Sequence, residues 1–171
     1  MYELRKPVVA DAERIGEIHT ISWQAAYRGM MPHEYLDALD PQVRITMWRN
    51  GLESGDRLDG IRRVAVHSES GRIDGFVLAG PARGDERVGE IYVIYLDPDA
   101  FGAGAGSLLF DESTAELARA GFTEGILWVH PENQRARQFY EHKGWAFDGE
   151  RRLETLDDIE IPEVRYRGIL K

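Results

Sequence analysis

Apolar residues near the N-terminal end of the chain recur at helical spacing. A short strand around residues 2–5 comes first, and Asp11 then has the side chain of a helix N-cap. From there to about Tyr27, residues suited to a buried face return every three or four positions, which predicts a long helix. Two further helices are predicted after Pro32 and after Asp40-Pro41.

The rest of the chain is predicted to alternate between strands and helices. Segment 89–96 is rich in β-branched and aromatic residues and gives the strongest strand signal. The other predicted elements are strands at 64–66, 73–79, 126–129, 145–147 and 164–170, and helices at 104–120 and 133–142. Because there is no internal repeat or linker, this order predicts one mixed α/β domain with a partly antiparallel sheet.

Composition and charge narrow the classes of function. The chain has 171 residues, 43% of them hydrophobic, which suits a single globular core. It contains no cysteine, so disulfides, cysteine metal sites and a cysteine nucleophile are excluded. The net charge of −9 disfavours sequence-independent binding to nucleic acid. Neither a membrane-spanning apolar run nor a signal-peptide core is found, so we expect a cytoplasmic protein.

A glycine-rich turn follows the strongest predicted strand and precedes a helix. Its glycines alternate with alanines, at Gly102, Gly104 and Gly106. Small residues let a ligand approach the main chain, and the first turn of a helix presents free N–H groups to an anion. Between Asp85 and Glu116 there are eight acids and one base, so main-chain amides would have to hold that anion. A flexible glycine-rich connection is the alternative.

Two familiar glycine motifs do not fit this turn. A P-loop needs lysine before the hydroxyl residue, but Gly106 is followed directly by Ser107. A dinucleotide-binding fingerprint that begins at Gly102 or Gly104 lacks its third glycine. The turn is therefore interpreted as a site for a different phosphate-bearing ligand.

A second group of residues lies on the predicted helix 133–142. Ala136, Phe139 and Tyr140 share one helix face, and Gly144-Trp145 follows the helix end. A tyrosine hydroxyl held on a rigid helix can donate a proton to a leaving group. The alternative is a core tyrosine whose hydroxyl is satisfied within the fold.

Together, the two segments resemble the GCN5-related N-acetyltransferase (GNAT) family. Ile94-Tyr-Leu-Asp-Pro followed by the glycine turn is similar to the acetyl-CoA motif of that family, and Asn133 to Trp145 is similar to its second motif. The resemblance implies a mixed, mostly antiparallel twisted sheet with splayed central strands and flanking helices. It also implies a helical acceptor lid within residues 1–60, an acetyl-CoA-binding core at 60–150 and closing strands at 150–171.

The resemblance also implies the roles of individual residues. Main-chain groups of the strand end would pair with the pantetheine arm, backbone amides of the turn would hold the pyrophosphate, and Asn133 would contact the arm or fix the local backbone. The implied cofactor-binding residues are Ile94, Tyr95, Leu96, Phe101, Gly102, Ala103, Gly104, Ala105, Gly106, Ser107, Asn133 and Tyr140. Phe101 stands where the family usually has glutamine or arginine, so a side-chain contact is lost and weaker affinity is expected.

The chemistry needs a polarised carbonyl, a base and an acid. A main-chain N–H near Tyr95 would polarise the carbonyl, and Tyr140 would protonate the leaving thiolate. Glu90, which opens the strand, is the candidate base, with His130 or water as alternatives; a solvated glutamate without a role is also possible at a strand start. Because the chain lacks cysteine, direct transfer to the acceptor is favoured over an acetyl-cysteine intermediate.

The acceptor is the least specified part of the prediction. Trp23, Tyr27 and Met30, with Met31 and Tyr35, either line an acceptor pocket or pack the helices onto the sheet. A polyamine, an aminoglycoside-like drug, an amino acid or a peptide N-terminus would each fit. The competing hypotheses are a non-catalytic acyl-CoA-binding module and a toxin that acts on charged tRNA, against which the missing basic surface argues.

Metal and partner sites complete the set of expectations. The five histidines have no metalloprotease spacing, so no metal is expected. An exposed strand edge at 164–170 suggests a homodimer. No contact with nucleic acid or membrane is expected.

Overall fold

The computed structural model describes residues 1–55, 60–156 and 158–171, and within them the strands form one seven-stranded sheet. The strands are β1 (Tyr2–Arg5), β2 (Ile61–His67), β3 (Ile73–Ala82), β4 (Asp85–Leu96), β5 (Glu124–Val129), β6 (Ala146–Leu156) and β7 (Ile159–Ile169). The helices are α1 (Ala12–Tyr27), α2 (His33–Asp37), α3 (Pro41–Ser54), α4 (Ala105–Arg119) and α5 (Gln134–His142), with 3₁₀ turns η1 (Val9–Asp11) and η2 (Pro98–Ala100).

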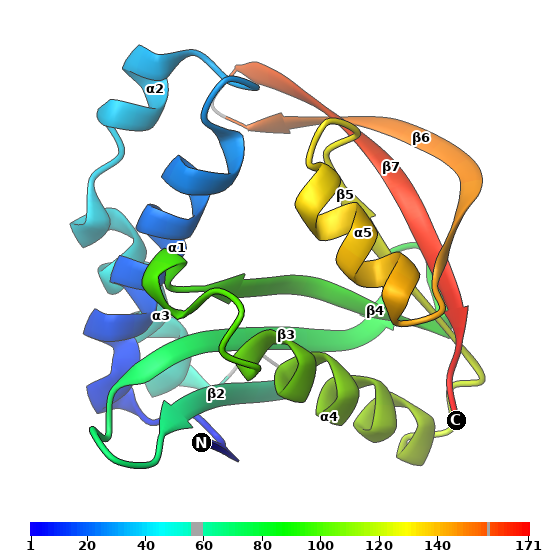
Figure 1. Ribbon diagram of the computed structural model, residues 1–171, viewed down its shortest axis with the longest axis horizontal. Coiled ribbons are helices and arrows are strands. Elements are labelled where there is room, and N and C mark those ends of the chain that lie inside the picture. Colours follow the sequence, from blue (N-terminus) through cyan, green and yellow to red (C-terminus); the bar gives the residue numbers. More distant parts are fainter. Residues whose placement is uncertain (56–59, 157) are drawn as a thin grey trace.

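The sheet order is β1-β2-β3-β4-β5-β7-β6, and β4 and β5 are its parallel pair. These two strands pair only at Gly89 with Gly125 and at Glu90 with Ile126. Beyond Glu90 they separate, and the two halves of the sheet run in different directions (Figure 1). The mixed, mostly antiparallel sheet with splayed central strands is therefore confirmed.

Helices cover both faces of the β1–β4 half. Helix α4 buries Leu109 and Leu117 against one face, in a core cluster that extends to α5 and β7. Helices α1 and α3 bury Ile15 and Trp48 against the other face. Figure 1 shows α4 and α5 on one side of the sheet and the α1–α3 layer beside the end of β4. The free end of β4 thus lies where all these layers meet. None of the helices in the described part combines the length and apolarity that a membrane span requires.

Three expectations from the sequence are corrected at the two ends of the chain. The segment 164–170 is not an exposed edge, because β7 lies between β5 and β6, and β6 forms that edge of the sheet. The closing strands are also longer than expected. The residues of β6 are charged and mostly exposed, because the strand pairs on one side only, and they therefore lack the apolar pattern that predicts a strand. Asp11 precedes α1 as predicted, but its carboxylate accepts a hydrogen bond from the N–H of Val8 and does not cap the helix.

Candidate active site

Beyond Glu90, the edge of β4 that faces the splay pairs with no other strand in the described part of the chain. The N–H of Asp97 donates to the carbonyl of Asp74 at 2.8 Å, and the register continues through Tyr95 opposite Phe76. In an antiparallel pair, alternate residues direct their main-chain groups to the partner strand, so those of Tyr95 face β3. Those of Ile94 and Leu96 face the open edge. This edge can pair with an extended ligand as another strand would.

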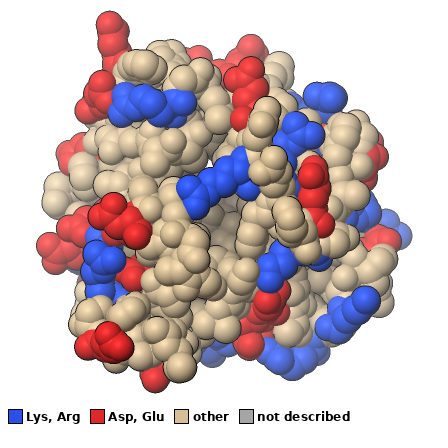
Figure 2. Space-filling model, in the orientation of Figure 1, with Lys and Arg blue, Asp and Glu red and all other residues tan. Residues whose placement is uncertain are grey.

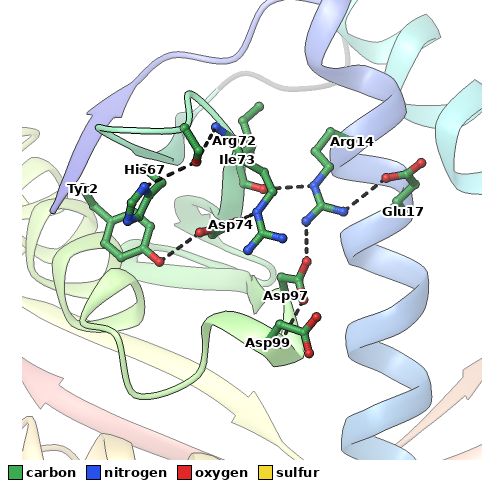
Figure 3. Close-up of polar contacts among 10 residues, drawn as sticks. Tyr2, Arg14, Glu17, His67, Arg72, Ile73, Asp74, Asp97 and Asp99 are labelled. Carbon is green, nitrogen blue, oxygen red and sulfur yellow. Dashed lines mark hydrogen bonds and ion pairs between the residues drawn. The ribbon is translucent and has the colours of Figure 1, made fainter.

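The turn after β4 is anchored by the polar network drawn in Figure 3. The guanidinium of Arg14, on α1, donates to the carbonyl of Ile73 at 3.0 Å and forms an ion pair with Asp97. The other oxygen of Asp97 accepts from the N–H of Asp99 at 2.9 Å. Burial alone would raise the pKa of Asp97, but the Asp99 N–H and the Arg14 guanidinium together hold it below its usual value. The turn therefore begins from a fixed point between α1 and β3.

The first turn of α4 is open to an anion. Gly104 is its N-cap, with a φ of +97°, and Gly102 has a φ of +78°, a backbone conformation that favours glycine. No side chain caps this helix end, and no acid lies in its first turn. The N–H groups of residues 104–107 precede the first bond of the helix ladder, which the N–H of Leu108 makes to the carbonyl of Gly104 at 3.1 Å. They can donate to phosphate oxygens.

A basic side chain that was not predicted reaches this turn from α5. The guanidinium of Arg135 lies 3.5 Å from the centre of the Phe101 ring. Figure 2, drawn in the orientation of Figure 1, shows a hollow near the middle of the visible surface, with a Lys or Arg side chain at its rim. Asn133 caps α5, since its side-chain oxygen accepts from the N–H of Ala136 at 3.1 Å. Asn133 therefore fixes the local backbone from which Arg135 extends.

Tyr140 lies deep between α4, α5 and β7. It is 7% exposed, and its ring centre is 6.0 Å from those of Phe110 and Tyr166. Its hydroxyl makes no hydrogen bond within the described residues, whereas that of Tyr166 accepts from Arg137 at 3.0 Å and donates to Glu141 at 2.7 Å. Burial raises the pKa of Tyr140, so its hydroxyl keeps its proton at neutral pH. The hydroxyl proton of Tyr140 is therefore available for donation to a ligand.

A buried and a half-buried carboxylate lie near the splay. Glu90 is 3% exposed, and its Oε2 accepts from the N–H of Arg83 at 2.9 Å. Glu163, on β7, pairs with Arg152 at 2.7 Å, and burial nevertheless raises its pKa. The charge of Glu90 makes a small further contribution to that rise. Glu163 was missed in the sequence because the strand that presents it was predicted to begin only at Val164.

His130 is the alternative base predicted from the sequence, and its hydrogen bonding disfavours that role. Its Nδ1 lies 3.2 Å from the N–H of Glu132, which places a lone pair at Nδ1. The neutral ring therefore carries its proton at Nε2, where it is a donor. Burial lowers the pKa of His130, which keeps the ring neutral.

The predicted acceptor residues separate into different surroundings. Trp23 Nε1–H donates to the hydroxyl of Tyr95 at 2.8 Å, and burial raises the pKa of Tyr95 to about 12. The Tyr27 ring lies 4.8 Å from Trp23 and 5.9 Å from His130, so Trp23 and Tyr27 connect α1 to the splay. Met31 is buried in a core cluster with Trp23. Met30 lies outside that cluster and does not line the cavity beside Trp23.

Comparison with known proteins places these features in a family. The model of the Acetyltransferase (GNAT) family matches residues 23–145. An uncharacterized N-acetyltransferase, YuaI of Bacillus subtilis, is 29% identical over 171 residues, which is 99% of this chain and 91% of that protein. The mycothiol acetyltransferase of Geodermatophilus obscurus is 37% identical over 92 residues, 54% of this chain but only 26% of that longer protein.

A solved structure shares the fold across the whole chain. The PaiA N-acetyltransferase of Thermoplasma acidophilum, in complex with coenzyme A, superposes with a TM-score of 0.74. The alignment covers 99% of both chains at 21% identity. At this identity the likeness concerns the fold.

Proposed function

Because the chain belongs to the GNAT family of acetyltransferases, we propose that it transfers the acetyl group of acetyl-CoA directly to a primary amine of a small molecule or peptide. One observation carries this proposal: the open main-chain edge at Ile94 and Leu96 leads directly to the uncapped start of α4. No covalent enzyme intermediate is needed. The alternative function is that of a non-catalytic acyl-CoA-binding module. Such a module would bind its ligand at the same strand edge and turn, and would not need the hydroxyl proton of Tyr140.

The residues present fit acetyl-CoA, the acetyl donor of the family. The edge at Ile94 and Leu96 suits the amide groups of an extended pantetheine arm. The N–H groups of Gly102 and of residues 104–107 suit a pyrophosphate. Those of Phe101 and Ala103, which the sequence also predicted as donors, are engaged by the carbonyls of Pro98 and Ala100. Arg135 supplies a cation at the turn, in place of the side-chain contact that Phe101 lacks. Binding is therefore expected to depend mainly on main-chain donors, with one arginine beside them.

Three groups of this chain would act on the reaction. When bound, acetyl-CoA supplies an acetyl thioester as the electrophile. A main-chain N–H at Ile94 or Leu96 donates a hydrogen bond toward the carbonyl position, since those of Tyr95 face β3. Tyr140 holds at its hydroxyl oxygen the proton that the leaving thiolate needs. Glu90 takes the proton of the amine, through a water molecule, at the carboxylate oxygen not engaged by Arg83.

The assignment of the base is tested by replacing the carboxylates of Glu90 and Glu163 separately. We expect Glu90→Gln to lower kcat/KM by about 100-fold, the usual contribution of a general base. Glu163→Gln, which loses the ion pair with Arg152, should change stability more than turnover. The reverse result, with turnover lost in Glu163→Gln and kept in Glu90→Gln, would move the base to β7.

Release of free coenzyme A tests the proposed function as a whole. Acetyl-CoA is incubated with the protein and with amines, polyamines, amino acids and peptides, and free thiol is measured. Amine-dependent release together with an acetylated product is expected. A thermal shift with acetyl-CoA but no release with any amine would favour the non-catalytic module. The absence of any thermal shift would contradict the cofactor assignment itself.

A further inference from the structure

A cavity of about 340 Å³ lies on the acceptor side of the fold, between the three N-terminal helices and the end of β6. Its apolar walls include Trp23, Leu39, Val43 and Leu156. The polar groups in its lining are those of His19, Thr20, Tyr35, Asp40 and Arg44. A cavity with apolar walls and a few polar groups is the usual form of a small-molecule site.

His19 presents a hydrogen-bond donor in this lining. The residue is 8% exposed, and its Nδ1 accepts from the indole N–H of Trp48 at 3.2 Å. The proton of the neutral ring is therefore on Nε2, which has no hydrogen-bond partner among the described residues. Burial, with a smaller effect of the Arg44 charge, lowers the pKa of His19 to about 3 and keeps the ring neutral. An N–H in this position is available to an acceptor from outside the fold.

Arg44 brings a positive charge to the same lining. Its guanidinium lies 5.7 Å from the centre of the Trp23 ring, and in the described parts of the chain it has neither an ion pair nor a hydrogen bond. Asp40, the acid of the lining, is occupied with capping α3, since its carboxylate accepts from the N–H of Gln42 at 2.9 Å. The protein's own cation already lies over Trp23, which disfavours a substrate ammonium at that ring. The cavity instead offers two donors suited to an anion.

The cavity adjoins the end of β4. His19 and Trp23 both contact Tyr95, with a ring distance of 5.1 Å for His19 and a hydrogen bond from Trp23. We propose that this cavity binds the carboxylate of the acceptor through Arg44 and His19, so that the substrate is a primary amine that also carries a carboxylate, of the amino-acid type. The nearby charge of Asp40 and the presence of a single guanidinium favour a monoanion over a phosphate dianion.

This inference rests on the proposed function and deepens it. The amine nitrogen forms a bond to the acetyl carbon as the bond from that carbon to sulfur breaks. The amine proton goes to Glu90, and the departing thiolate takes the proton of Tyr140. The carboxylate takes no part in these bond changes. It anchors the acceptor beyond Trp23, so the amine is directed toward the splay between β4 and β5.

A matched panel of acceptors tests the inference. Each amino acid is compared with its carboxamide and with the corresponding decarboxylated amine, and coenzyme A release is measured. The wild type should prefer the carboxylated member by roughly 10- to 100-fold in kcat/KM, the usual effect of a charge-assisted hydrogen bond. Arg44→Gln should abolish this preference, mainly through KM, and Arg44→Lys should restore part of it. Arg49→Gln, an exposed change on the same helix outside the cavity, should preserve it.

The outcomes separate this inference from the proposed function. Equal turnover of acids, amides and decarboxylated amines by the wild type would overturn the carboxylate site and leave the acetyltransferase standing. If no amine is acetylated, the proposed function fails. Calorimetric titration of the same amino acids into wild type and Arg44→Gln then shows whether the cavity binds a carboxylate. Binding that requires Arg44 would support the site, and the absence of binding would overturn it.

Discussion

The hydroxyl of Tyr140 is the group whose removal tests the chemistry with the least disturbance of the fold. Tyr140→Phe deletes a single oxygen that has no hydrogen-bond partner within the described residues, while the ring keeps its contacts with Phe110 and Tyr166. No buried partner is left unsatisfied, so the free energy of unfolding should change by less than about 1 kcal/mol. The loss of a general acid should lower kcat by about 10²–10⁴-fold, or about 3–5 kcal/mol in the activation barrier.

The assay measures kcat from free-thiol release and the Kd of acetyl-CoA by calorimetry for the same preparation. The expected result is a large loss of kcat with Kd changed less than about threefold, because Tyr140 acts on the leaving group. Tyr166→Phe is the matched control, since its hydroxyl is bonded to Arg137 and Glu141. That variant should lose about 1 kcal/mol of stability and keep its kcat. If Tyr140→Phe retains kcat within threefold across a broad amine panel, the assignment of the acid is wrong.

Three further predictions concern the turn after β4. Gly104→Ala should lower the unfolding free energy by about 1–2 kcal/mol, because the φ of +97° at Gly104 disfavours a side chain. The same change should raise the Kd of coenzyme A. Thermal unfolding with and without the ligand measures both effects. Arg135→Gln should raise that Kd only about two- to fivefold in a calorimetric titration, since this exposed arginine assists the main-chain donors beside Phe101. The carboxyl group of Asp97 has a lower pKa in the folded state than in the unfolded state, where the value is about 3.9. Its ionised form therefore stabilises the fold above about pH 3.9, and this stabilisation is lost as the pH falls through the lower, folded-state pKa. Asp97→Asn should therefore be less stable than wild type at pH 7 in denaturant titrations, and the difference should shrink below about pH 4.

Local signals in the sequence predicted the elements that carry the cofactor site. The β-branched residues of β4, the glycines that follow it and the apolar face of α4 each act over a few positions. The left-handed conformations of Gly102 and Gly104 are one reason that glycine is needed there. The splay itself required the family resemblance, because strand pairing between distant segments leaves no local pattern.

Side chains whose roles depend on contacts with residues far away in the sequence could not be predicted from such local signals. Arg135 and Phe101 are far apart in sequence, and nothing in either segment indicates that a guanidinium covers the ring. The donor character of His19 depends on Trp48, and the neighbour of Arg44 is Trp23 on another helix. These pairs arise from the packing of α1 against α3, which the sequence specifies only through the whole core.

The direct test of the central account is a titration of coenzyme A into the isotopically labelled protein, followed by NMR of the backbone amides. If main-chain donors hold the pyrophosphate and the arm pairs with β4, the largest shifts should fall on residues 102–107 and on Ile94 and Leu96. Amides of the exposed face of β6 should remain unchanged. Saturable binding that leaves the amides of 102–107 unperturbed would contradict the account.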